Sequence, residues 1–148
     1  MTEPTAGSGR GSPLPLPIAV GWATVELDRA ATVLAPMLAP GTAFEPTSPS
    51  EHLGATCRVG RVDPAYVGEL AATVVLLEPS TEGRLAATLA RYGEGWCATW
   101  ERDPGPKVGA GGRTSAQRDG PLGPERLVLG GPVTGPHRLV LDAITIEA

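Results

Sequence analysis

Apolar positions follow two different spacings along this chain and predict an alternation of strands and helices. Short apolar or β-branched runs, bounded by Gly and Pro, are typical of strands. Strands are predicted, in chain order, over residues 18–26, 53–62, 69–78, 95–101, 126–130 and 137–147. The run at 69–78 is so apolar that we expect both faces of its strand to be covered.

Helical spacing occurs twice. Asp28 is predicted to cap a first helix of about two turns, which the prolines after it end. Its apolar stripe consists of Ala30, Val33, Leu34 and Met37. A second helix is predicted to start at Ser80 or Thr81 and to end at Gly93, a residue suited to the left-handed position after a helix. The stripe of this helix consists of Leu85, Leu89 and Tyr92.

Turn-forming residues fill the segments between these elements. Residues 40–52 are predicted to be a loop, residues 63–68 a hairpin connection and residues 103–124 a long irregular loop. Residues 1–17 have almost nothing to bury, which predicts a disordered tail. A single domain is therefore expected over residues 18–148.

Composition narrows the class of protein. The chain has 148 residues, of which 41% are hydrophobic, enough for one domain with a real core. Its net charge is −4 and its basic residues are scattered, so nucleic acid is not an expected partner. No run approaches the ~18 apolar residues of a membrane span, and no signal peptide is recognisable. We expect a cytoplasmic protein in which Cys57 and Cys97 stay reduced.

Three stretches resemble one protein family. They are GWATVELDRA at 21–30, LGATCRVG at 53–60 with VVLLEP at 74–79, and LARYGEG at 89–95. They resemble the vicinal oxygen chelate superfamily, to which the glyoxalases belong, and most closely its methylmalonyl-CoA epimerase branch. The resemblance implies an α+β fold, with a βαβββ module over about 18–92 and a degenerate second module over 93–148. It also implies a mixed, curved sheet that forms a cup, and pairing into a homodimer.

Metal-dependent members of this family hold a divalent cation with His, Glu or Gln side chains from four strands. Aligning the motifs puts Ala19, Val75 and Ala98 at three of these positions and Val140 or its neighbour at the fourth. None of these side chains binds a cation. The resemblance therefore implies a protein without the metal, and we expect no other cofactor.

Strand alternation then predicts which side chains face the cup. If Ala98 faces inward, Trp96 and Trp100 do so too. The same rule adds Thr73 and Leu77 around Val75, and Gly21 next to Ala19. Two indoles above a small apolar floor predict a site for a hydrophobic or aromatic small molecule. The alternative is that both indoles simply fill the cup as core.

These observations favour a small-molecule-binding protein that is not an enzyme, of the bleomycin-resistance type in this superfamily. One alternative is a metal-independent isomerase or lyase that uses acid–base groups of the cup. Its candidate catalytic residues are Arg58, Glu78 and His137, although Glu78 is also interpreted as a solvated strand end. Glu94 is interpreted as a backbone contact. A partner-binding module with a filled, dry cup is the third possibility.

Overall fold

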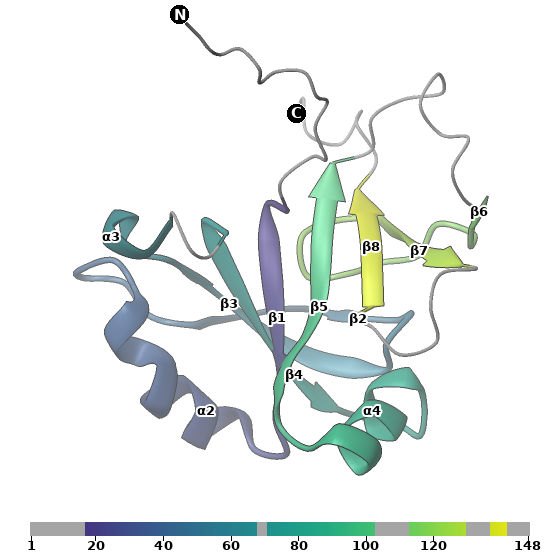
Figure 1. Cartoon of the computed structure of the whole chain (residues 1–148), viewed down its shortest axis with the longest axis horizontal. Helices are drawn as coiled ribbons and strands as arrows, with labels where there is room; N and C mark the ends of the chain where they lie inside the picture. The colour runs from purple at the N-terminus through teal and green to yellow at the C-terminus, as the bar shows by residue number, and fades with distance from the viewer. Residues whose placement is uncertain (1–16, 68–70, 103–112, 130–136, 142–148) are drawn as a thin grey trace, which may run out of the picture.

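A single curled sheet organises the molecule (Figure 1). The computed structural model describes residues 17–67, 71–102, 113–129 and 137–141. The helices are α2 (Leu27–Leu34), the 3-10 helix η1 (Ala35–Met37), α3 (Pro64–Val67) and α4 (Arg84–Tyr92). The strands are β1 (Ala19–Ala23), β2 (Glu45–Ser50), β3 (Ala55–Arg61), β4 (Thr73–Pro79), β5 (Gly95–Arg102), β6 (Arg113–Thr114), β7 (Glu125–Leu129) and β8 (His137–Leu141).

The sheet consists of two sets of four strands with the same internal order. Its eight strands run β2-β3-β4-β1-β5-β8-β7-β6. β1 is parallel to β4, β5 is parallel to β8, and β1 and β5 meet antiparallel at the centre. The first set, with α2, is the predicted βαβββ module in a mixed curved sheet. In the second set β6 has only two residues, and residues 103–112, where a matching helix would lie, are outside the described ranges.

The two faces of the sheet carry separate clusters of buried side chains. One cluster, the concave cluster, combines residues of β3 and β7, which are separated by four other strands in the sheet order. The sheet must therefore curl around it. In the other cluster, the α2 cluster, side chains of α2 and of the segment before β2 (Leu38 and Phe44) pack against the outer side of β4. Val74 and Leu76 belong to the α2 cluster and Val75 and Leu77 to the concave cluster, so β4 is covered on both faces as predicted.

The prediction that residues 40–52 form a loop is wrong. Residues 45–50 form β2, which pairs antiparallel with β3. Pro46 and Pro49 are tolerated because β2 is an edge strand of the sheet. A missing N–H there need not remove a hydrogen bond between strands. The predicted hairpin connection at 63–68 contains the short helix α3.

The two predicted helices exist, with errors in their apolar stripes. In α2 the buried side chains are Leu27, Ala30 and Leu34, whereas Val33 is 61% exposed. In α4 Leu85 is buried but Tyr92 is 59% exposed. The predicted caps are wrong: the N-cap residue is Glu26 and not Asp28 in α2, and Gly83 and not Ser80 or Thr81 in α4. Neither N-cap residue makes a side-chain hydrogen bond to its helix. The stop at Gly93 is confirmed: its φ is +81° and its N–H donates to the carbonyl oxygen of Leu89.

Some predictions fall outside the described residues. These are the disordered tail over 1–16, residues 103–112 of the irregular loop predicted over 103–124, and the end of the last strand at 142–147. The described part of that loop contains the short strand β6. Within the described ranges, no helix has the length and apolar character needed to cross a membrane.

Candidate functional site

The predicted cup-lining residues lie on the concave face, with one exception. Ala19, Val75, Leu77, Ala98 and Trp100 are all buried members of the concave cluster. Thr73 lies two positions before Val75 on β4 and is half-buried. These side chains already pack against one another, so whether any of them contacts a ligand stays a prediction.

The indole of Trp100 occupies the middle of this face. A Cβ atom at Gly21 would lie 2.9 Å from Cζ3 of Trp100, 2.9 Å from Cδ1 of Leu77 and 3.2 Å from Cβ of Ala98. The ring therefore lies directly over a backbone that has no side chain. Gly21 is thus explained by packing, because any larger residue would displace the ring.

The prediction that Trp96 and Trp100 share the cup is wrong, because a β-bulge separates them. β1 pairs Gly21 with Ala98 but Trp22 with Trp96, so Cys97 is an extra residue on β5. Trp96 makes an edge-on contact with Trp22 (ring centroids 4.9 Å apart), and Trp22 packs against the α2 cluster. Trp96 is 46% exposed on the outer face, whereas Trp100 is fully buried.

A buried glutamate that the sequence did not single out holds Trp100. The indole N–H of Trp100 donates to Oε1 of Glu125 (2.8 Å), and the hydroxyl of Ser50 donates to Oε2 (2.8 Å). Glu125 and Trp100 are fully buried and Ser50 nearly so. Gly120 lies against the carboxylate so closely that a side chain there would overlap it. A polar network of three residues is therefore built into the apolar cup.

Burial raises the pKa of Glu125 to about 7, against the hydrogen bonds from Trp100 and Ser50, which lower it. An acid of this kind exchanges protons near neutral pH. The sequence signal was weak: Glu125 precedes the RLVL run and alternates with Leu127 and Leu129, the pattern of an inward-facing residue. The predicted strand began one residue later, at 126.

Glu125 also joins two parts of the sheet that are far apart in strand order. Ser50 is the last residue of the edge strand β2, and Glu125 is the first residue of β7. Next to them the N–H of Glu51 donates to the carbonyl oxygen of Asp119 (3.1 Å). Nε2 of His52 lies 3.0 Å from the carbonyl oxygen of Ala116. These contacts between residues 50–52 and residues 115–125 form what we call the seam.

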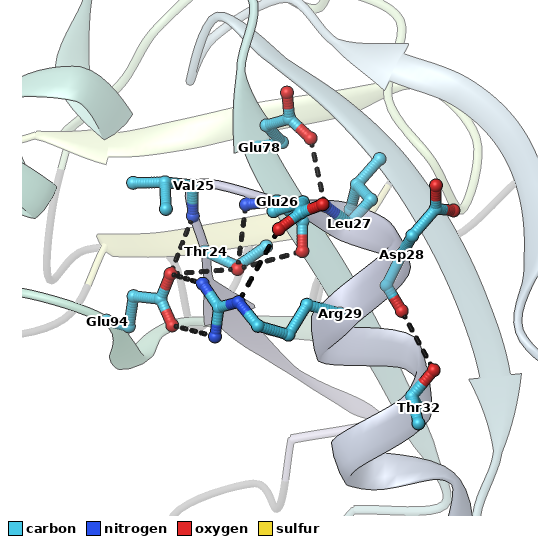
Figure 2. Close-up of polar contacts among 9 residues, drawn as sticks. All are labelled: Thr24, Val25, Glu26, Leu27, Asp28, Arg29, Thr32, Glu78 and Glu94. Atoms are coloured by element: carbon cyan, nitrogen blue, oxygen red, sulfur yellow. Dashed lines mark hydrogen bonds and ion pairs between the residues drawn. The ribbon is translucent and has the colours of Figure 1, made fainter.

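Two of the three predicted catalytic residues lie on the wrong face. Arg58 alternates with the concave residues of β3 and pairs with Asp28 at 2.6 Å. Glu78 faces outward in the same way, and its Oε1 accepts a hydrogen bond from the N–H of Leu27 (3.0 Å; Figure 2). It caps α2 from a neighbouring strand, which explains why α2 needs no cap of its own.

Glu94 forms a second polar joint, drawn in Figure 2. Its Oε2 accepts hydrogen bonds from the N–H of Val25 (2.9 Å) and the hydroxyl of Thr24 (3.0 Å), and both of its oxygens are contacted by Arg29. The hydrogen bond from Arg29 is the largest cause of a lowered pKa of Glu94, and the N–H of Val25 is the second. They bring this pKa to about 2. Glu94 therefore does contact backbone, as expected, and ties the start of β5 to the β1–α2 turn.

His137 is the predicted catalytic residue that does lie on the concave face, where it alternates with Leu139 and Leu141. Thr88 donates its hydroxyl proton to the carbonyl oxygen of Arg84 (2.9 Å), so its oxygen accepts from Nε2 of His137 (2.8 Å). Burial, followed by the charge of Arg84, lowers the pKa of His137. A neutral imidazole fixed against α4 results.

The positions aligned with metal ligands carry apolar side chains. Ala19, Val75 and Ala98 lie on the concave face, while Val140 faces outward between its concave neighbours Leu139 and Leu141. Among the residues described, no three His, Cys, Asp or Glu side chains are grouped to hold a metal ion. Burial raises the pKa of Cys57 and of Cys97 to about 12, so neither is an activated thiolate.

Solved structures of proteins from several bacteria have the same fold. A variant of Streptomyces coelicolor methylmalonyl-CoA epimerase, in complex with 2-nitronate-propionyl-CoA, matches with a TM-score of 0.65 and 18% identity, over 88% of this chain and 96% of its own. Methylmalonyl-CoA epimerase from Mycobacterium tuberculosis matches with 0.64 and 18%, over 88% and 90%. A hypothetical protein from Bacillus halodurans C-125 matches with 0.62 and 13%, over 86% and 93%.

No protein-family model matches the chain, and no curated protein matches it in sequence. The likeness to solved structures, together with the strand order, shows that this chain has the fold of the vicinal oxygen chelate superfamily. The resemblance inferred from its motifs is thereby confirmed at the level of fold.

Proposed function

We propose that this chain is a metal-independent small-molecule-binding protein, whose hydrophobic or aromatic ligand enters the concave side of the sheet. The observation that carries this proposal is an incompletely covered apolar rim. Five hydrophobic side chains packed against the concave cluster are only partly buried: Ile18, Val59, Leu89, Leu122 and Leu129. Ligand sites are typically apolar surfaces of this kind with a few polar groups, here Thr73 and His137.

The structural neighbours support a small molecule as the ligand. Methylmalonyl-CoA epimerases were solved with acyl-CoA molecules, so this fold accommodates small molecules in other proteins. In this chain the aligned ligand positions are Ala19, Val75 and Ala98. Apolar contacts would replace coordination there, because none of these side chains donates an electron pair to a cation.

The test is a titration with a probe, since the ligand is unidentified. We expect 1-anilinonaphthalene-8-sulfonate to bind the protein, with the same affinity before and after treatment with a chelator. Leu89→Glu introduces a charge on the concave rim and should weaken binding at least about tenfold, roughly 1.4 kcal/mol. The matched control is Val33→Glu, on the exposed side of α2, which should bind the probe as the natural chain does.

Two results would contradict the proposal. Equal binding to the Leu89 and Val33 variants would move the site away from the concave face. Binding that disappears on chelation and returns with a divalent ion would overturn metal independence.

A metal-independent isomerase or lyase is the second candidate, and the pKa of Glu125 favours it. A general acid–base group works best when its pKa is near the working pH. Glu125 pairs with Leu141 on β8. His137 lies four residues before Leu141 on the same strand, so the backbones of Glu125 and His137 are roughly 13 Å apart along β8. They would act singly on opposite ends of a ligand. Turnover that survives a chelator and is lost in Glu125→Gln or His137→Gln would favour an enzyme.

A further inference from the structure

The seam closes the curled sheet without a continuous strand ladder. β2 is one edge of the sheet and β6 the other, and the described residues of the two edges are not paired with each other. One backbone hydrogen bond crosses the seam, from Glu51 to Asp119, and the remaining contacts come from side chains. A joint built in this way opens at a lower free-energy cost than a ladder, because few hydrogen bonds must be broken together.

Glu125 is the buried ionisable group at the centre of the seam. Titratable and charged groups approach the seam from each element packed there: Cys57 from β3, Glu51 and His52 from the β2–β3 turn, and Arg118 and Asp119 from the segment before β7. Glu51 repels a charge on Glu125, and the guanidinium of Arg118 lies 3.5 Å from Glu51. Among the described residues, the two side chains that donate to the carboxylate, Trp100 and Ser50, are neutral, and the guanidinium of Arg118 contacts Glu51 instead.

The carboxyl group of Glu125 keeps both of its hydrogen-bond partners, Trp100 and Ser50, in either protonation state. With the carboxylate ionised, Ser50 and Trp100 donate to it. With the carboxyl protonated, Oε1 still accepts from Trp100 and the acid proton is donated to the oxygen of Ser50, which also accepts from the N–H of Leu53. The carboxyl group has two partners in either state, but in the protonated state the hydroxyl proton of Ser50 loses Glu125 as its acceptor. The two states therefore differ in the free energy of burying the charge and in this one donor.

We propose that Glu125 is a proton-operated latch on the concave face: its protonated form holds the seam shut, and its ionisation favours opening toward the ligand site. This regulation rests on the function proposed above. Opening exposes the carboxylate to water, and hydration of the charge offsets the loss of the contacts with Ser50 and Trp100.

The direction follows from proton linkage. In the closed seam burial raises the pKa of Glu125 from 4.5 to about 7, and exposure returns it toward 4.5. The closed form therefore holds the proton more tightly and is favoured at low pH. Its advantage falls as the pH rises from about 4.5 to 7 and is then constant. Over that range the ratio of closed to open molecules falls by up to about 300-fold.

The experiment uses Trp100 as a reporter of its own hydrogen bond. Trp22→Phe with Trp96→Phe leaves Trp100 as the single tryptophan, in the full chain. Acrylamide quenching of its emission is measured from pH 5.5 to 8.5. We expect the quenching constant to increase at least about twofold as the pH rises, with a midpoint near 7. The reason is that acrylamide reaches the ring of Trp100 in the open form, whereas the ring is fully buried in the closed form. Glu125→Gln, which keeps the shape without the charge, should give a flat profile.

Ser50→Ala is the second variant, in case the glutamine does not fold. It removes one donor to the ionised carboxylate and should move the midpoint to higher pH. A flat profile in the single-tryptophan protein overturns the latch. So does an unchanged titration in Glu125→Gln or an unmoved midpoint in Ser50→Ala.

Anilinonaphthalene sulfonate binding separates this proposal from the function on which it rests. Tighter probe binding at pH 8 than at pH 6 in the natural chain, with no such difference in Glu125→Gln, supports both. A titrating Trp100 without probe binding at either pH retains the latch and removes the proposed function. Probe binding that is equal at both pH values, with a flat Trp100 profile, retains the function and removes the latch.

Discussion

Two glutamates join the two halves of this sheet, and they do so in opposite environments. Glu94 ties the start of β5 to the β1–α2 turn, with Arg29 as a partner and a side chain that is 27% exposed. Glu125 ties β7 to the end of β2 with two neutral donors and no exposure. The pKa of Glu94 is lowered to about 2, whereas that of Glu125 is raised to about 7.

The difference between these two glutamates shows what decides whether the pKa of a bridging carboxylate is lowered or raised. Both residues accept well-formed hydrogen bonds, so hydrogen bonding alone does not separate them. At Glu94 a cation and surrounding water favour the charge, whereas at Glu125 burial disfavours it. The first joint is strongest near neutral pH and the second at acidic pH.

The largest expected effect comes from removing the indole that Glu125 holds. Trp100→Ala leaves a cavity within the concave cluster and leaves the carboxyl group of Glu125 without its indole donor. The variant should lower the free energy of unfolding by about 4 kcal/mol. Urea denaturation measures it. Trp96→Ala, on the half-exposed face near Trp22, is the matched control and should cost about 1 kcal/mol. Equal losses would mean that the buried joint is no more important than the outer aromatic pair.

A pH series sharpens the comparison next. Because the folded pKa of Glu125 lies above its unfolded value of 4.5, its contribution is fully present below pH 4.5 and is lost by about pH 7. The loss should be roughly 3 kcal/mol, measured as the difference between the natural chain and Glu125→Gln across that range. A difference that is independent of pH would show that Glu125 titrates normally in the folded protein.

The packing of the buried joint predicts an intermediate effect. Gly21→Ala puts a methyl group 2.9 Å from Leu77 and Trp100, and should cost about 2 kcal/mol by overpacking. Thermal unfolding measures it. Gly83→Ala is the control: its nearest neighbour lies at an ordinary 3.6 Å, and the loss should stay below about 1 kcal/mol, the usual cost of alanine at a helix N-cap. If Gly21→Ala is equally neutral, the ring of Trp100 has room to move.

The smallest effect is expected at the exposed joint. Glu94→Gln removes the ion pair with Arg29 and should lower stability by less than about 1 kcal/mol, because solvent screens the charges. The sign is opposite to that of Glu125: the stabilisation is present above pH 4.5 and is lost as the pH falls toward 2. Repeating the measurement in 1 M salt should reduce the difference, and a difference that salt leaves unchanged would contradict this account.

Much of the first module was predictable, because local signals and burial agree at β1, β4 and the two helices. The apolar run of β4 and the stop at Gly93 each have a strong local cause, whereas Asp28, predicted as the cap of α2, lies inside the first turn of that helix. β2 was missed because Pro and Ser do not favour strands, and only its place at the sheet edge permits them. Val33 and Tyr92 show that apolar spacing does not reveal how far a neighbouring element extends.

The candidate site was only partly predictable, for a different reason. Alternation places Ala19, Val75, Leu77 and Ala98 correctly, because β1 and β4 are regular. One inserted residue at Cys97 reverses the alternation and puts Trp96 on the outer face. Glu125 depends on a contact with Ser50 across the curled sheet, and no local pattern reports such a contact.

The prolines of β2 have a consequence for self-assembly. An outer strand normally offers a row of free donors on which the strand of another molecule can grow, and fibrous aggregates spread in this way. Pro46 and Pro49 remove two of the six backbone N–H groups of β2, and its register with β3 is interrupted between Thr47 and Ser50. This flank of the sheet is therefore a poor template for strand addition, and a variant with Thr at both positions would be more prone to form β-rich aggregates.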